Sequence, residues 1–138
     1  MIATLILPLL AQAAADTPPV PEWNCDDPQV QQEMNWCAGR DFAVADERLN
    51  AQWKITSEVM KQRDAEWAEI GSADTRPGFF SSLLDAQRAW LRYRDAHCRV
   101  DGYIARGGTL EPLLVSTCKA RLTRMRTEEL KALVDIEG

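Results

Sequence analysis

The chain has 138 residues, which is enough for one domain and too few for two comfortable ones. Its formal net charge is −5, from 16 basic and 21 acidic side chains, which argues against a nucleic-acid-binding protein because such proteins carry a basic excess. The sequence contains a single histidine, His97, and this excludes every metal site or catalytic mechanism that needs two. With 46% hydrophobic and 27% charged residues, the composition is typical of a globular protein.

Residues 1–15 are predicted to be a secretory signal peptide. Ile2–Leu10 is almost entirely apolar, and small residues suited to cleavage follow near Ala13-Ala15. The apolar stretch is shorter than the ~20 residues that a membrane span needs, and no cysteine follows it directly for lipid attachment, so no membrane anchor is expected. The protein is therefore expected to be periplasmic or secreted, with a proline-rich arm at residues 16–24 and one folded domain at residues 25–138.

The four cysteines are separated by gaps of 12, 61 and 20 residues, so the sequence has no C-x-x-C motif for zinc binding or dithiol redox chemistry. An even number of cysteines in a small exported domain favours two disulfides. Three connectivities are possible. We predict the local pairing, Cys25–Cys37 and Cys98–Cys118, because each bond closes a short loop, which stabilises the fold by about 3 kcal/mol in the chain-entropy model.

A long amphipathic helix is predicted from about Asp27-Pro28 to the residue before Gly71. Side chains recur on one face at three- and four-residue steps: Met34, Ala38, Phe42, Ala45, Leu49, Trp53, Thr56, Met60 and Trp67. As one straight helix, residues 28–70 would span ~64 Å, against ~36 Å for the next predicted helix. The first helix must therefore overhang its partners or bend, and Gly39 is the natural place for a bend.

Two further helices are predicted. The second runs from about Pro77 to Val100, with an inner face of Phe80, Leu83, Leu84, Gln87, Trp90, Leu91, Arg94 and Cys98. A loop at Asp101–Thr109 precedes the third helix, and Thr109 is the candidate for its N-cap. The inner face of the third helix consists of Val115, Cys118, Leu122, Met125, Leu130 and Leu133. No stretch alternates with period two for long enough to form a strand. The predicted fold is an all-α, disulfide-stapled bundle of three main helices.

The second predicted helix contains the most distinctive segment of the sequence. Trp90 and Arg94 are four residues apart, so the guanidinium can stack on the indole. Gln87 and Arg94 project to the same side and need partners if they are buried. Asp46 and Asn50, four apart on the first helix, are suited to supply them. We interpret these five residues as a structural polar cluster.

No group of residues forms a recognisable catalytic constellation. His97 lies two residues from Asp95, and such positions do not face each other on a helix. Ser81 and Ser82 lack the G-x-S-x-G elbow of a nucleophile, and the Gly107-Gly108 pair follows no strand, so a phosphate cradle is unsupported. We expect no enzymatic activity, no cofactor and no metal, and we predict a binding protein.

Charge is unevenly distributed along the chain. Residues 16–75 carry 13 acidic and 5 basic side chains, a net of −8, whereas residues 76–138 carry 8 acidic and 11 basic ones, a net of +3. Much of this difference is expected to pair inside the bundle. A sharper hypothesis is an acidic face offered to a basic partner, formed by Asp41, Asp46, Glu47, Glu58 and Glu66. The candidate partner-binding residues are Asp41, Glu47 and Glu58 on the first predicted helix, and Asp101 and Arg106 in the loop between the second and third predicted helices.

Several short motifs combine into a resemblance: Glu33–Ala38, Ala45–Asn50, Ala86–Trp90, Tyr93–Ala96 with Cys98, Gly107–Thr109, Cys118, and Leu122-Thr123 with Arg126. Together they resemble the LprI-type lysozyme inhibitor domain, long catalogued as a domain of unknown function, over roughly residues 25–134. The resemblance implies an exported, helical, disulfide-bonded protein and, for the named member, inhibition of lysozyme. This chain lacks that member's lipid-attachment cysteine, so membrane tethering is not implied.

The leading functional hypothesis is a periplasmic inhibitor that occludes lysozyme or a related muramidase. C-type lysozymes are cationic, so an acidic protein suits electrostatic steering toward them. Two alternatives remain open: an immunity protein against a delivered wall-degrading toxin, and a structural envelope module that binds no hydrolase.

Overall fold

The computed structural model describes residues 23–135, which form three long helices and a short 3₁₀ turn. The elements are α1 (Gln31–Ile70), α2 (Phe79–Gly102), η1 (Tyr103–Ala105) and α3 (Glu111–Val134). These described residues contain no strand, so the prediction of an all-α bundle is confirmed. The expected signal peptide and residues 16–22 of the expected arm lie outside the described residues.

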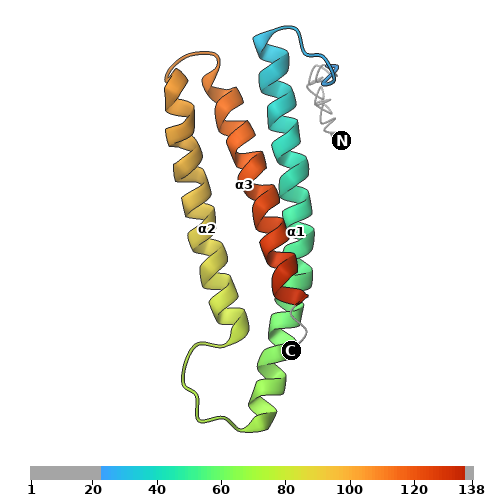
Figure 1. Cartoon of the computed structure of the whole chain (residues 1–138), viewed down its shortest axis with the longest axis vertical. Coiled ribbons are helices and arrows are strands. Elements are labelled where there is room, and N and C mark those ends of the chain that lie inside the picture. Colours follow the sequence, from blue (N-terminus) through green and yellow to red (C-terminus); the bar gives the residue numbers. More distant parts are fainter. Residues whose placement is uncertain (1–22, 136–138) are drawn as a thin grey trace, which may run out of the picture.

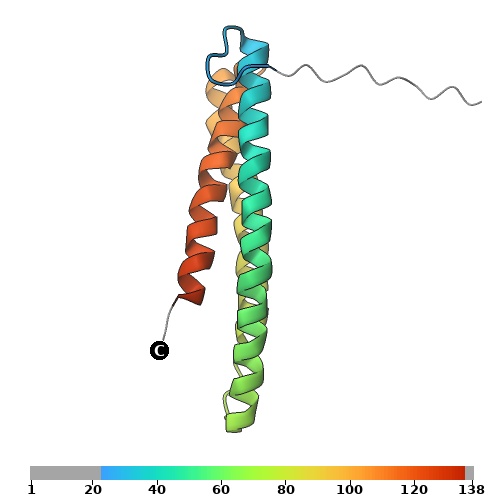
Figure 2. The same cartoon turned by 90° about the vertical axis from the view of Figure 1, so that its right-hand side faces the viewer.

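The three helices lie side by side in an elongated bundle (Figure 1). α2 runs antiparallel to α1, and α3 returns in the direction of α1, on which it packs most extensively. We call the end where α1 begins and α2 joins α3 the apical end, and the end at residues 71–78 the basal end. Figure 2 shows that α3 stops well short of the basal end, so α1 and α2 continue beyond it as a pair.

α1 begins three residues later than predicted, at Gln31 rather than Pro28. The Glu33 carboxylate accepts the backbone N–H of Gln29 at 2.7 Å and that of Val30 at 3.4 Å, which satisfies amide groups before the first turn. The helix ends as predicted at Gly71, whose φ of 69° is left-handed. It continues without interruption through Gly39, so of the two alternatives, a bend or an overhang, the structure shows the overhang (Figure 2).

The connection between α2 and α3 also differs from the prediction. α2 extends to Gly102 and continues into η1, so the predicted loop at 101–109 is largely helical. The N-cap position of α3 is Leu110 rather than Thr109, and a proline lies in the first turn. No side chain caps this helix, and the Glu111 carboxylate accepts the backbone N–H of Gly107 in the preceding turn.

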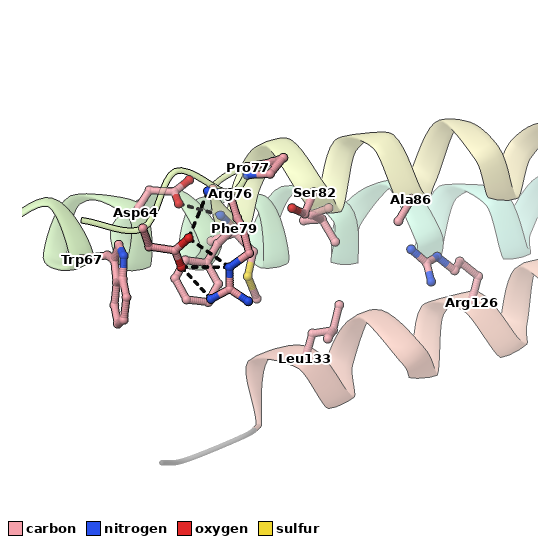
Figure 3. A pocket seen from close by; sticks show the side chains of 13 residues that line it. Asp64, Trp67, Arg76, Pro77, Phe79, Ser82, Ala86, Arg126 and Leu133 are labelled. Atoms are coloured by element: carbon pink, nitrogen blue, oxygen red, sulfur yellow. Dashed lines mark hydrogen bonds and ion pairs between the residues drawn. The ribbon is translucent and has the colours of Figure 1, made fainter. Parts of the chain in front are cut away.

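The core consists of two clusters joined by Trp90. One contains Leu49, Met60, Leu83 and Leu130, and the other contains Cys98, Cys118 and Leu122. Three residues on the predicted inner faces are instead exposed: Trp67 at 45%, Leu91 at 37% and Met125 at 53%. Trp67 lies beyond the end of α3, where no third helix covers α1 (Figure 3).

Both predicted disulfides are present. Cys25 is bonded to Cys37 and Cys98 to Cys118, with Cα–Cα distances of 5.6 and 5.4 Å. Both bonds lie at the apical end. One ties the segment before α1 to the first turns of α1, and the other joins α2 to α3 below their connection. The prediction of a disulfide-stapled bundle is therefore confirmed.

Candidate functional site

Arg94 is the centre of the polar cluster that the sequence indicates. Its side chain is 9% exposed, and its guanidinium contacts Asp46 of α1 at 3.1 Å and the neighbouring Asp95 at 3.0 Å. It also donates a hydrogen bond to the Thr123 hydroxyl of α3 at 3.4 Å. A buried cation is tolerated only when it is paired in this way, so Arg94 fixes the positions of three helices relative to one another.

Two aromatic rings flank the same guanidinium. The carbon at its centre lies 5.2 Å from the Trp90 ring, as the spacing of the sequence suggests, and 5.1 Å from the Phe42 ring. Lys119 adds a second cation at 5.6 Å from Phe42 and an ion pair with Asp95 at 3.6 Å. The Arg94 guanidinium is thus engaged within the fold through two of its nitrogens and both of its faces.

The remaining members of the predicted cluster have different partners from those expected. Asn50 donates to Asp46 at 3.3 Å, so it supports the carboxylate and not Arg94 directly. Gln87 accepts a hydrogen bond from Arg126 of α3 at 2.9 Å, a partner that sequence reasoning missed. The signal for it was the position of Arg126 one turn after Leu122 on the inner stripe of the third helix.

The acidic residues of α1 do not form one continuous surface. Asp41 binds Arg124 of α3 through both carboxylate oxygens at 3.0 Å, and Asp46 is committed to Arg94. At about 100° per residue, Glu47 and Glu58 share one side of α1, and Asp41 lies about a quarter-turn or more away from them. Two acidic side chains of α1 thus pair with basic residues of α2 and α3, while Glu47 and Glu58 remain exposed.

The apical turn, residues 103–110, is the most prominent exposed feature of the apical end. Arg106 lies within it, whereas Asp101 lies in the last turn of α2 and is partly buried. Ile104 is 85% exposed, although a side chain of this kind is normally buried. Other large apolar side chains exposed around it are Val100, Tyr103 and Leu110. An apolar group of this kind at the end of a molecule indicates an interaction site.

The backbone of the apical turn is held by a series of hydrogen bonds. Gly107, at a left-handed φ of 76°, donates its N–H to the Glu111 carboxylate at 2.6 Å, and Gly108 donates to the Ala105 carbonyl at 2.8 Å. The Thr109 carbonyl accepts from the Asn35 side chain of α1 at 2.9 Å. These bonds tie the turn to α1 and to the start of α3, and the Cys98–Cys118 bond joins the two helices that it connects.

Arg106 completes the surface of this turn. Its guanidinium lies 4.5 Å from the centre of the Tyr103 ring, a cation–π contact that orients both side chains. Tyrosine and arginine are the residue types enriched in the energetic centres of protein interfaces. The sequence analysis named Arg106 in this segment as a candidate and did not single out Tyr103 and Ile104, because an apolar pair directly after a helix resembles a continuation of its buried face.

A second feature, the basal groove, lies where α3 ends (Figure 3). It has a volume of about 710 Å³. Its apolar lining comes from Met60, Trp67, Phe79, Leu83 and Leu133. Sequence reasoning missed this groove, because it depends on where α3 stops relative to the other helices.

The charged groups of the basal groove already have partners. Asp64 accepts the backbone N–H groups of Phe79 at 2.6 Å and Phe80 at 3.0 Å, and so caps α2 from α1. The Arg76 guanidinium binds Asp74 at 2.6 Å and holds the pKa of that carboxyl below its usual range (Figure 3). The groove therefore offers an apolar surface without a free charge to fix a ligand's orientation.

Two possibilities for the described residues, 23–135, are not supported. They contain no group of three or more His, Cys, Asp or Glu side chains placed to hold a metal ion. None of their helices is both long enough and apolar enough to cross a membrane.

Comparison with known proteins identifies the family. Residues 25–130 match the family described as "Lysozyme inhibitor LprI". An uncharacterized protein of Rhizobium meliloti (strain 1021) is 43% identical over 115 residues, which is 83% of this chain and 81% of that protein. No solved structure matches the chain. The match spans both disulfides, the polar cluster and the apical turn, and the chain belongs to the LprI lysozyme inhibitor family.

Proposed function

We propose that this protein is an exported inhibitor that blocks lysozyme, or a related muramidase, by occluding the enzyme. The proposal rests on the match of residues 25–130 to a family of lysozyme inhibitors. This family is not a family of enzymes. The family and the two disulfides both favour an extracytoplasmic location, where cell-wall hydrolases act. The rigid apical turn with its exposed apolar side chains supports a role in protein binding.

The charge of the molecule is compatible with such a partner. The net charge is −5, and C-type lysozymes are cationic, so long-range attraction accelerates the encounter of the two proteins. Glu47 and Glu58 are exposed on one side of α1 and are the candidates for this attraction. Asp41, first expected to act with them, lies on another side of α1 and is paired with Arg124, and Glu58 has Lys61 at 3.9 Å.

The direct test is a cell-wall turbidity assay with the purified, oxidised protein against several types of lysozyme. The expected result is stoichiometric inhibition of at least one type, together with a complex that survives gel filtration. Absence of inhibition and of binding for every lysozyme would refute the proposal. Binding to a different wall-degrading enzyme alone would instead favour an immunity protein.

Electrostatic steering can be tested separately, because it changes the association rate constant and leaves the dissociation rate constant nearly unchanged. The double variants Glu47→Gln/Glu58→Gln and Glu47→Lys/Glu58→Lys change the net charge by two and four units. We expect the association rate constant to fall in that order, with nearly constant dissociation. Raising the ionic strength from about 0.01 to 0.15 M shortens the Debye length from ~30 to ~8 Å and should remove most of the difference. Equal rates for all three proteins at low salt would contradict steering by these residues.

A further inference from the structure

We infer that the apical turn is the part of this molecule that enters the substrate cleft of the inhibited enzyme. In this arrangement, Ile104 is the apolar anchor and Arg106 faces the acidic groups of the cleft. The inference rests on the proposed function and assigns to it a surface that the family match does not identify.

The first support is shape. The apical turn is the exposed connection between α2 and α3 at one end of a long bundle, beside the first turns of α1 (Figure 1). A glycosidase binds its polymeric substrate in a concave cleft, and only a convex surface fills such a cleft. At 85% exposure, Ile104 has almost its whole side chain available for burial against the walls.

The second support is rigidity. Binding costs free energy when a loop must be ordered, and a preorganised loop avoids that cost. Gly107 and Gly108 are fixed by hydrogen bonds to Glu111 and Ala105, and Thr109 is tied to Asn35 of α1. The disulfide between Cys98 and Cys118 holds the two helices that carry the turn. Few other surfaces of the molecule combine exposed apolar groups with this degree of restraint.

The third support is charge. Glycosidases of the lysozyme type use a pair of carboxyl groups on either side of the scissile bond, so the cleft has acidic groups at its centre. Arg106 lies in the apical turn and, among the described residues, has a cation–π contact with Tyr103 but no ion pair. The cation of the apical turn is complementary in charge to the acidic cleft of the enzyme. The acidic remainder of the molecule is complementary to the basic surface that surrounds the cleft.

The basal groove is a weaker candidate for the same role. It is concave, so it does not fill a cleft, and its carboxylates and Arg76 are engaged by partners within the groove. Ile70, which is exposed at the end of α1, and Arg76 of the groove therefore provide a control that is matched in residue type but lies at the opposite end of the molecule.

The test compares the double variant Ile104→Ser/Arg106→Gln with the double variant Ile70→Ser/Arg76→Gln. Inhibition constants are measured for the lysozyme type that the wild-type protein inhibits. The apical variant is expected to weaken inhibition by about thirtyfold or more, the loss typical of residues at the centre of an interface. The basal control should remain within about threefold of the wild type. Both should melt at the wild-type temperature, since the altered side chains are exposed.

A second measurement asks whether the cleft itself is occupied. A short chitin oligosaccharide that binds the cleft should compete with the wild-type protein for the enzyme. Undiminished inhibition by the apical variant, or simultaneous binding of oligosaccharide and inhibitor, would overturn the inference and leave the proposed function intact. A wild-type protein that inhibits no lysozyme would refute both. If the apical variant loses only binding to phospholipid vesicles, the turn is a membrane contact and the inference is wrong.

Discussion

The apical and basal ends are built from the same two long helices, yet they are restrained very differently. At the apical end α3 completes the bundle, two disulfides join neighbouring segments, and the connecting turn is tied to α1. At the basal end α1 and α2 continue as a pair, with a groove between their apolar faces and no disulfide among residues 60–86.

The cross-links and three-helix packing of this small protein are gathered at its apical end, so local stability is expected to be higher there than at the basal end. Local opening requires little free energy where few apolar contacts are broken, and more where cross-links and three packed helices must separate. The basal end is therefore expected to exchange its amide hydrogens sooner than the apical end. Four predictions follow from the contrast, from the largest expected effect to the smallest.

The largest effect is expected from removing the disulfide at the base of the apical turn. The variant Cys98→Ser/Cys118→Ser should lower the free energy of unfolding by about 3–5 kcal/mol, because the loss of the cross-link adds to the burial of two hydroxyl groups. Cys98 is 0% and Cys118 3% exposed. The control Cys25→Ser/Cys37→Ser, at a more exposed bond, should cost about 2–3 kcal/mol. Urea unfolding measures both, and equal losses would contradict the role of burial.

The next effect concerns the cation that joins the three helices. Arg94→Met leaves Asp46 without its partner but retains much of the packing between Phe42 and Trp90. We expect a loss of about 2 kcal/mol, less than for a fully buried pair because the Asp46 side chain is 39% exposed. Arg124→Met removes an exposed pair and should cost about 1 kcal/mol or less. Thermal unfolding measures the loss of stability in each variant. If Arg124→Met lost as much stability as Arg94→Met, burial would not determine how much these ion pairs contribute.

A smaller, local effect is expected at the basal end. Asp64→Ala removes the acceptor for the first N–H groups of α2 and should cost about 1 kcal/mol. Hydrogen exchange should accelerate in the first turns of α2 and the last turns of α1, and remain unchanged near Cys98. Asp64→Asn keeps one oxygen acceptor and should lose less. Faster exchange throughout the bundle would contradict the independence of the two ends.

The smallest effect involves the exposed pair of the basal loop. Because Arg76 lowers the pKa of Asp74, the pair stabilises the folded state above the ordinary pKa of an Asp, and this contribution is lost as the pH falls through the lowered value. Arg76→Gln should raise the pKa of Asp74 toward its ordinary range, as an NMR titration of the side chain would show. The melting temperature near neutral pH should hardly change, since both groups are at the surface. A clear drop in that temperature would give the loop a structural role.

Much of the fold could be predicted from the sequence because it depends on local patterns. The repeat of apolar residues located the three helices, Gly71 marked the end of the first, and the cysteine spacing favoured the observed bonds. The exposure of Trp67 could not be predicted in this way, because it depends on where α3 stops.

The candidate site was predicted less completely. Arg106 was identified from its loop, but the exposure of Ile104 depends on how two helices end around it. The expected acidic face was overestimated, because the ion pair between Asp41 and Arg124 joins residues 83 positions apart. Asp64 as the cap of α2 was missed for a similar reason, since a helix terminus is normally capped by its own chain neighbours.

The order of the cysteines has a consequence for how the protein matures. Each disulfide joins consecutive cysteines: the first with the second, and the third with the fourth. A chain that reaches an oxidising compartment from its N-terminus exposes Cys25 and Cys37 before Cys98 and Cys118 arrive. Bonds formed in order of emergence are then the native bonds, and no incorrect bond must be broken by thiol–disulfide exchange. For a protein exported as proposed, we therefore expect a thiol oxidase to be sufficient for maturation, without a disulfide isomerase.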